Sequence, residues 1–438
     1  MATVSIFGLG YVGSVVAACL AEAGHKAIGI DANPAKIALI ADGRSPVVEN
    51  GLEELVRRGV KNGRIRATKD AAQAVLDSSI SMICVGTPSD HSGGPDLSYV
   101  VRVSEEMGDA LRSKEEYHVI AVRSTVLPGT TEEVVIPLLE RRSGKKAKRD
   151  FGICFNPEFL REGSSIEDFY DPPYTVIGSD DERAASALAE LYSMLAAPVV
   201  VLPFKVAEML KYANNAFHAL KVCFANEIGN LCRKQNIDSH QVMNIVCMDK
   251  KLNLSSYYLK PGFAFGGSCL PKDLRGLLHR SRHLDLPSPL LEAILPSNSQ
   301  QVEIACQMIE RMGRRRVGIC GFSFKAGTDD LRESPVVKLI EFLIGKGYPL
   351  KVYDENVSLG SVVGANRAYI QQTVPHIGCL MADSLDAVME WSDVIIIGTH
   401  SHRVESALVK LNPNQAVLDL VRIRPAACMN GNYQGICW

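Results

Sequence analysis

Residues 3–13, which read TVSIFGLGYVG, decide the fold of the first half of this chain. Five mainly apolar residues run into a turn that contains Gly8, Gly10 and Gly13, and an Ala-rich apolar segment follows. This pattern predicts a strand, a tight turn and a helix. The next predicted strand, residues 26–30, ends at Asp31.

Such a turn places a pyrophosphate at a helix N-terminus, and the acidic residue then binds a ribose. Because the Asp31 carboxylate repels a 2′-phosphate, we expect NAD rather than NADP. The alternative is an ordinary glycine-rich turn that binds no nucleotide.

Strands are also predicted at residues 81–85 and 119–122, and each is followed by small polar residues that include Thr87 and Thr125. Strands that alternate with helical segments are typical of a parallel, doubly wound sheet.

The same order of elements recurs after residue 314, with predicted strands at residues 316–320, 350–353, 394–397 and 417–420. In place of a second G-x-G-x-x-G motif, the loop at 321–332 has glycines together with Lys325 and Arg332, which suits a polyanionic ligand. A solvated basic pair on a surface loop is the alternative.

Residues 206–233 contain no proline and one glycine, which predicts a long helix between the halves. One face is apolar. The opposite face has Lys211, Asn215, His218 and Asn226 at helical spacing. A solvated face is usually rich in Lys and Glu, so we expect this one to line a site.

We therefore predict an α/β protein with two Rossmann-like doubly wound domains joined by a long central helix. The predicted boundaries are 1–203 for an NAD-binding domain, 204–312 for a central helical domain and 313–438 for a second nucleotide-binding domain.

The composition excludes several classes of function. The 438 residues include 47 Lys and Arg against 49 Asp and Glu, a net charge of −2 that argues against a nucleic-acid partner. No apolar stretch is long enough to span a bilayer, and the start of the chain lacks the basic region of a signal peptide. The 12 cysteines show no metal-ligand spacing, so we expect reduced thiols, no metal and a cytoplasmic protein.

Residues 265–273, FGGSCLPKD, contain a cysteine suited to catalysis. The two glycines allow a close approach of the backbone to a ligand, and Pro271 fits the first turn of a helix. Cys269 is then expected just before that helix, whose positive end favours the thiolate. Asp273 follows within about one turn.

Residues 156–162, NPEFLRE, place two carboxylates four residues apart. Taken alone, this segment is typical of an acidic surface turn.

In combination these motifs resemble the UDP-glucose/GDP-mannose dehydrogenase family, in order and over nearly the whole chain. The segments that carry the resemblance are the glycine turn at 8–13, residues 156–162, Glu208-x-x-Lys211-x-x-x-Asn215, residues 266–273 and residues 325–332. Residues 251–255, 257–258, 261–265 and 435–438 are similar to members that oxidise GDP-mannose to the GDP-mannuronate used for alginate.

The resemblance implies a four-electron oxidation of a sugar C6 alcohol to a carboxylate, with two NAD+ consumed. A water held by Asp273 and Lys211 is implied as the base of the first oxidation. Cys269 then forms a thiohemiacetal and a thioester, with Lys211 and Asn215 stabilising the alkoxide. Glu162 is implied to orient the hydrolytic water.

The resemblance also assigns binding residues, with Thr125 counted among both the catalytic and the NAD contacts. Those implied for NAD are Gly8, Gly10, Tyr11, Val12, Gly13, Asp31, Lys36, Thr87, Thr125, Glu162, Lys272 and Arg332. Those implied for the nucleotide sugar, GDP-mannose, are Glu162, Lys211, Asn215, His218, Asn226, Tyr257, Tyr258, Lys260, Phe263 and Lys325. The family implies a homodimer or a larger homo-oligomer built around the central helix.

At position 260 the chain departs from the GDP-mannose-oxidising members, since Lys260 replaces an arginine. The compact ammonium group of lysine therefore replaces the planar guanidinium group of arginine, which can donate two parallel hydrogen bonds.

Three other functions compete with this one. A two-electron hydroxyacid dehydrogenase shares the first domain but needs no activated thiol and no second nucleotide-binding half. Oxidation of UDP-glucose uses the same mechanism with a different base. A catalytically silent nucleotide-sugar sensor is expected to lack one of Lys211, Asn215, Cys269 or Asp273, and all four are present.

Overall fold

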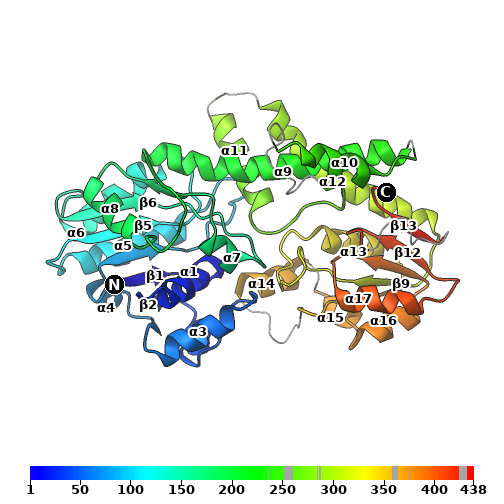
Figure 1. The fold of residues 1–438 in the computed structure, drawn as a ribbon, viewed down its shortest axis with the longest axis horizontal. Helices are drawn as coiled ribbons and strands as arrows, with labels where there is room; N and C mark the ends of the chain where they lie inside the picture. Colours follow the sequence, from blue (N-terminus) through cyan, green and yellow to red (C-terminus); the bar gives the residue numbers. More distant parts are fainter. Residues whose placement is uncertain are drawn as a thin grey trace. The chain divides into compact units, whose positions relative to one another are not determined.

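The computed structural model describes residues 1–234, 236–250, 260–283, 285, 288–357, 364–373, 375–423 and 432–438. These residues form two compact units, the first made of Met1–Asn214 and Arg275–Leu284 and the second of Asn215–Leu274 and Asp285–Trp438. Helix α9 (Phe204–Lys234) begins in the first unit and continues into the second as one helix (Figure 1).

The first unit contains a sheet of the strands β1 (Thr3–Phe7), β2 (Lys26–Ile30), β3 (Ile65–Thr68), β4 (Ile80–Ile83), β5 (His118–Val122), β6 (Phe151–Phe155), β7 (Thr175–Gly178) and β8 (Val199–Leu202). Its helices are α1 (Tyr11–Glu22), α2 (Pro34–Ala41), α3 (Leu52–Lys61), α4 (Ala71–Leu76), α5 (Ser98–Leu111), the π-helical turn η1 (Thr131–Val135), α6 (Ile136–Ser143), α7 (Ser165–Tyr170) and α8 (Glu182–Glu190).

The order of strands in this sheet is β3-β2-β1-β4-β5-β6-β7-β8. The run β3-β2-β1-β4-β5-β6 is parallel and has the strand order of a dinucleotide-binding fold. The pair β6–β7 is antiparallel, a feature that the predicted all-parallel sheet did not include.

Each face of the first sheet has its own core because alternate residues of a strand point to opposite faces. Val4 and Ile6 of β1 pack with the buried residues of α1 and α3. Phe7 and residues of β5 pack with the buried residues of α5 and α6. The sheet is therefore covered on both faces, as predicted for a doubly wound domain.

Beyond α9, the helices are α10 (Ser239–Met248), α11 (Leu270–His283) and α12 (Pro289–Arg311). The second sheet has the strands β9 (Val317–Cys320), β10 (Leu350–Tyr353), β11 (Val394–Ile397), β12 (Ala416–Asp419) and β13 (Tyr433–Gly435). Its helices are α13 (Pro335–Gly345), α14 (Gly364–Thr373), α15 (Ile377–Leu380), α16 (Leu385–Trp391), α17 (His402–Ala407) and the 3₁₀ turn η2 (Leu408–Lys410).

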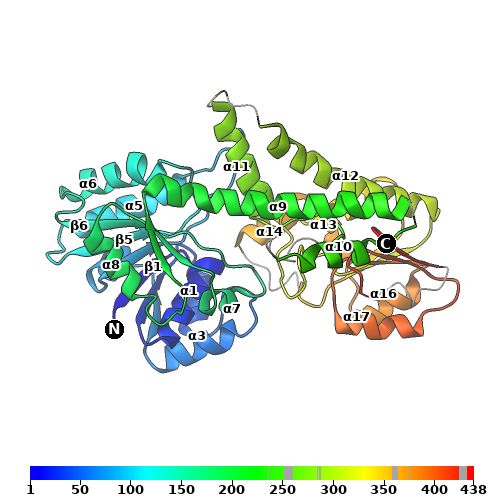
Figure 2. The same ribbon diagram turned by 45° about the horizontal axis from the view of Figure 1, so that its top comes forward.

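The second sheet is parallel throughout, in the order β10-β9-β11-β12-β13. Helices α13 and α16 cover opposite faces of it (Figure 2), each with a separate hydrophobic core. The predicted fold class, with two Rossmann-like domains joined by a long helix, is confirmed.

Among the residues that the structure describes, no helix combines the length and the apolar character needed to cross a bilayer. The described cysteines are free thiols.

Candidate active site

The glycine-rich turn of the first unit lies where the order of strands reverses, at the carboxyl ends of β1 and β4. A Cβ on Gly8 would lie 2.7 Å from the carbonyl oxygen of Cys84, which follows β4, and a Cβ on Gly13 would collide with the carbonyl oxygen of Gly8. A Cβ on Gly10 meets nothing within 4 Å. Gly8 and Gly13 thus permit tight packing, while the open space at Gly10 suits the close approach of a pyrophosphate.

Asp31 binds the backbone of this turn, and its side chain remains partly exposed to solvent. Its Oδ2 accepts a hydrogen bond from the Leu9 amide at 2.8 Å and lies 3.2 Å from Lys36 Nζ, and its side chain is 12% exposed. The predicted NAD residues Asp31 and Lys36 are therefore in contact. The residues of this turn and Asp31 fit a dinucleotide whose ribose carries free hydroxyl groups.

Thr87 and Thr125 follow the neighbouring strands β4 and β5, and Thr87 Oγ1 donates to the carbonyl of Thr125 at 2.7 Å. Tyr11 and Val12 open helix α1 directly after the glycine turn. These four predicted NAD residues all lie near the carboxyl ends of parallel strands, the edge at which such sheets bind ligands.

The second unit repeats this arrangement around Gly321, which follows β9. A Cβ on Gly321 would collide with Thr399, which follows β11, and the backbone amides of Phe322 and Ser323 donate to Asp354 Oδ2 at 2.9 and 3.0 Å. Asp354 thus closes the turn of the second sheet as Asp31 closes that of the first. This shared hydrogen-bonding pattern supports the predicted duplication of the fold.

Lys211 of α9 forms a buried ion pair that the sequence analysis did not predict. Its Nζ lies 2.9 Å from Glu158 Oε1, and the two side chains are 5% and 8% exposed. Burial raises the pKa of Glu158, but the charge and hydrogen bond of Lys211, together with Arg123, outweigh this effect and lower it. Glu158 therefore belongs to the candidate site, although its segment on its own is typical of a surface turn.

The loop that carries Glu162 is fixed on both sides of that residue. The Arg161 amide donates to Asp168 at 2.8 Å. The Gly163 and Ser165 amides donate to the two oxygens of buried Glu49 at 2.7 and 2.9 Å. Glu49 was also missed by the sequence analysis, because its partners lie more than 100 residues further along the chain.

Glu208, one turn before Lys211 on α9, is fully buried and accepts hydrogen bonds from the Gly129 amide and from both the amide and the hydroxyl of Thr131. This residue of the family motif therefore fastens α9 to the first turn of η1.

Asn215 lies one turn after Lys211 on α9, so the two side chains share a face. Asn215 Nδ2 donates to Asp273 Oδ2, and Lys272 Nζ lies 3.0 Å from Asp273 Oδ1. Asp273 is 2% exposed. The predicted residues Asn215, Lys272 and Asp273 are therefore brought together.

Cys269 lies at the N-terminus of α11, as predicted. Its carbonyl accepts the Asp273 amide at 2.9 Å, the first hydrogen bond of the helix, and its side chain is exposed. By contrast, burial raises the pKa of Cys84 and of Cys320 to about 12. Cys269 is thus an accessible thiol at the positive end of a helix dipole, whereas these two are buried residues of the sheets.

Within the second unit, the Cys269 loop packs directly on the loop at 321–332 that carries Lys325 and Arg332. A Cβ on Gly266 would collide with the carbonyl oxygen of Glu333, and a Cβ on Gly267 would lie 2.8 Å from the Phe324 ring. Lys325 follows Phe324, and Arg332 pairs with the buried carboxylate of Asp330 at 3.0 Å. The two glycines are needed because another protein segment, rather than open space, adjoins the loop.

Other substrate residues differ from expectation or lie outside the described part of the chain. The carboxamide of Asn226 accepts a hydrogen bond from the Gly262 amide and donates one to the Phe263 carbonyl. The Phe263 side chain packs against the core of the second unit. Lys260 is exposed, and His218 is half-buried on α9. Tyr257 and Tyr258 lie outside the described residues.

Comparisons with known proteins identify the family of the chain. Residues 2–196, 205–300 and 318–424 match the NAD binding domain, the central domain and the UDP binding domain of the UDP-glucose/GDP-mannose dehydrogenase family. GDP-mannose 6-dehydrogenase of Pseudomonas putida is 50% identical over 436 residues, which cover 99% of this chain and 100% of that protein.

The solved structures that align with nearly the whole chain include two dehydrogenases of nucleotide sugars. A ternary complex of GDP-mannose dehydrogenase from Pseudomonas aeruginosa is 50% identical, with a TM-score of 0.57 over 99% of this chain and 100% of that one. A UDP-glucose dehydrogenase from Pyrobaculum islandicum is 35% identical, with a TM-score of 0.90 over 100% of this chain and 98% of that one. The chain is therefore an NAD-dependent nucleotide-sugar dehydrogenase that belongs to the UDP-glucose/GDP-mannose dehydrogenase family.

Proposed function

We propose that the chain oxidises GDP-mannose at C6 to GDP-mannuronate, with two NAD+ reduced for each sugar. The observation that carries this proposal is the 50% identity to GDP-mannose 6-dehydrogenase along the whole chain. The accessible Cys269, the Lys211–Glu158 pair and the Asn215–Asp273 pair supply the groups that a four-electron oxidation needs.

In this proposal residues 1–203 bind NAD, residues 204–312 carry Lys211, Asn215, Cys269 and Asp273, and residues 313–438 bind the nucleotide. Gly8, Gly10 and Gly13 hold the pyrophosphate, and Asp31 with Lys36 holds the adenosine ribose. Tyr11, Val12, Thr87, Thr125, Lys272 and Arg332 complete the NAD contacts. Bound NAD+ supplies the hydride acceptor for both oxidations.

The first oxidation converts the C6 alcohol to an aldehyde. A water held by Asp273 and Lys211 takes the hydroxyl proton as hydride leaves C6. Asp273 suits this role because Asn215 and Lys272 fix both of its oxygens.

In the second oxidation the Cys269 thiolate adds to the aldehyde and forms a carbon–sulfur bond. Lys211 and Asn215 stabilise the resulting alkoxide, which collapses to a thioester as a second hydride leaves. Water, oriented by Glu162, then cleaves the thioester to the carboxylate and restores the thiol. The sum is one alcohol, two NAD+ and one water giving one carboxylate, two NADH and three protons.

Lys325, Lys260 and His218 supply cationic or hydrogen-bonding groups for the nucleotide sugar, together with Glu162, Phe263, Tyr257 and Tyr258. We assign Asn226 a different role, through the backbone that its carboxamide binds.

UDP-glucose is the second candidate substrate, favoured by the TM-score of 0.90 to the Pyrobaculum enzyme. Steady-state kinetics with both sugars distinguish the two. We expect kcat/KM for GDP-mannose to exceed that for UDP-glucose by at least about 100-fold, or ~2.7 kcal/mol. A preference for UDP-glucose would assign the chain to the other substrate.

We also propose that the chain assembles as a homodimer or larger homo-oligomer through the apolar face of α9. Val206, Phe217 and Phe224, which recur along that face, are 49%, 41% and 48% exposed. Apolar patches of this kind mark interaction surfaces. Light scattering of the protein and of Phe217→Glu/Phe224→Glu tests this point, and a wild-type monomer at micromolar concentration would exclude it.

A cytoplasmic location is part of the same proposal. The support for it is that the described cysteines are unpaired by disulfides, as is usual in a reducing compartment.

A further inference from the structure

The loop that leads to Cys269 has no regular secondary structure of its own. Residues 261–268 belong to no helix or strand, yet Ala264 and Phe265 are buried. Buried backbone amides and carbonyls need partners, since an unpaired group is costly. Three side-chain carboxamides, those of Asn226, Asn298 and Gln301, bind this backbone, and we call them the carboxamide clamp. The Phe263 amide also donates to the Leu420 carbonyl, and the Cys437 thiol to the Gly262 carbonyl.

Asn298 of α12 binds Phe265 at two points. The Phe265 amide donates to Asn298 Oδ1 at 2.8 Å, and Asn298 Nδ2 donates to the Phe265 carbonyl at 2.9 Å. One side chain thus satisfies both backbone groups, as a neighbouring β-strand does. Asn298 is only 8% exposed, so water cannot readily replace it.

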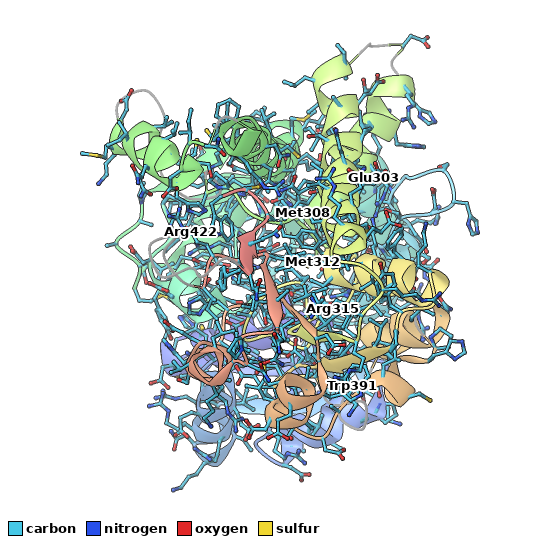
Figure 3. All side chains as sticks on the ribbon, turned by 90° about the vertical axis from the view of Figure 1, so that its right-hand side faces the viewer. Glu303, Met308, Met312, Arg315, Trp391 and Arg422 are labelled. Atoms are coloured by element: carbon cyan, nitrogen blue, oxygen red, sulfur yellow. The ribbon has the colours of Figure 1, made fainter. Side chains whose placement is uncertain are left out.

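Asn226 and Gln301 bind the loop three residues earlier. The Gly262 amide donates to Asn226 Oδ1 at 2.9 Å, and Gln301 Nε2 donates to the Gly262 carbonyl at 2.7 Å. Gln301 is 2% exposed, and Asn230 Nδ2 fixes its other end through a bond of 2.9 Å to Oε1. Asn298 and Gln301 come from the helix that carries the labels Glu303 and Met308 in Figure 3.

The next part of the loop, Gly266 and Gly267, is held by packing. As described above, neither position has space for a Cβ beside Glu333 and Phe324. The five residues from Phe265 to Cys269 therefore have little conformational freedom. A displacement of Phe265 has to move the thiol as well.

We propose that Asn298 and Gln301 are positioning residues that, with Asn226, hold the Cys269 thiol where it attacks the aldehyde. This inference rests on the proposed function of Cys269. Carboxamides suit the task because each offers a donor and an acceptor without a charge. A carboxylate in the clamp would oppose the thiolate through like charge.

The main variants are Asn298→Leu and Gln301→Met, which keep the side-chain size and remove the hydrogen bonds. Gln415→Met is the matched control, because Gln415 also donates to two carbonyls, those of Met389 and Ser392, but belongs to the second sheet domain and not to the loop. Each variant is assayed for kcat, for KM of GDP-mannose and NAD+, and for thermal unfolding.

A second readout does not depend on the substrate. Iodoacetamide alkylation of Cys269 is followed by peptide mass spectrometry, with Cys379, the other exposed thiol among the described cysteines, as the internal reference. We expect kcat of Asn298→Leu to fall about 100-fold, as misplacement of a reacting group by about 1 Å can cause, with KM for NAD+ changed less than about twofold. The ratio of Cys269 to Cys379 alkylation should change several-fold, while Gln415→Met keeps kcat and this ratio.

Asn298→Asp tests the inference even if Asn298→Leu folds poorly. A protonated carboxyl group can accept from the Phe265 amide and donate to its carbonyl, as the carboxamide does. Its kcat relative to wild type should therefore rise as the pH falls. A variant that is only less stable would not show this rise in relative kcat at low pH.

Unchanged kcat and alkylation ratio in folded Asn298→Leu, or no relative recovery of Asn298→Asp at low pH, would overturn the inference. If the clamp variants alter alkylation but wild type makes no acid from either sugar, the proposed function fails while the clamp's control of the thiol stands.

Discussion

Lys211 Nζ lies 2.9 Å from Glu158 Oε1, and both side chains are almost completely buried. A lysine that stabilises a developing alkoxide must stay protonated, although burial disfavours its charged form. Glu158 meets this need, because a neighbouring carboxylate favours the ammonium form. The family motif on α9 therefore depends on a residue 53 positions earlier in the sequence.

Breaking this pair should affect both stability and activity. Lys211→Met leaves the Glu158 carboxylate buried without its main cation, which we expect to cost about 3–5 kcal/mol in the free energy of unfolding. Glu158→Gln leaves the lysine unpaired in the same way. The double variant should recover part of the stability but no activity. Urea unfolding and steady-state rates measure this cycle, and additive stability losses would show that the two residues do not interact.

Asp31 should determine the choice of cofactor. A 2′-phosphate beside its carboxylate meets a like charge, which costs several kcal/mol, so kcat/KM for NADP+ should be at least about 100-fold below that for NAD+. In Asp31→Ser, Lys36 loses its partner and is available to a 2′-phosphate, so the ratio should move toward NADP+. Comparable use of both cofactors by wild type would refute this assignment.

Glu49 should affect the rate of acid formation because it positions the loop that carries Glu162. Glu49→Gln replaces one of the two oxygens that accept the Gly163 and Ser165 amides, so it should shift the loop. We expect a fall of about 10–100-fold in acid formation with little change in KM for NAD+, because small misplacements near a reacting group have large effects. Glu53→Gln, an exposed position on α3, is the control. Equal rates for the two variants would argue against this role.

His118 should make the protein sensitive to acid. Burial lowers the pKa of His118 from 6.5 to about 3, while its ring contacts Ser81 Oγ at 2.7 Å. Above pH 6.5 the ring is neutral in both the folded and the unfolded chain, so it has no effect. As the pH falls from 6.5 toward 3, only the unfolded chain takes up the proton, and stability should fall by up to about 1.4 kcal/mol per pH unit. Urea unfolding of wild type and His118→Asn between pH 7 and 4.5 checks this, and parallel pH curves for the two proteins would contradict it.

The sequence was sufficient for features set by local patterns. The glycine turn at 8–13, the strands that end at Asp31 and near Asp354, and the helix position of Cys269 all follow from spacing. The long helix α9 was predicted within two residues at its N-terminal end and one at its C-terminal end.

The features that were missed depend on contacts between distant residues. Glu158 and Glu49 each lie in a short segment with no helical or strand periodicity, and their roles come from partners elsewhere in the chain. Asn226 was correctly placed on the polar face of α9, but helical spacing could not show that its partner is the backbone at Gly262. The antiparallel pairing of β6 with β7 was missed because the residue pattern of a strand does not show the direction in which it pairs with another strand.

The most direct test of the account counts NADH and acid formed per sugar by wild type and by Cys269→Ser, with intact-protein mass spectrometry during turnover. Wild type should form two NADH and one carboxylate, with a transient mass increase that matches the thioester. Cys269→Ser should still bind NAD+ and the nucleotide sugar, but its acid formation should fall by several orders of magnitude, since losing a nucleophile can cost on the order of 10⁶-fold. Near-normal acid formation by Cys269→Ser, or one NADH with free aldehyde from wild type, would contradict the proposed mechanism.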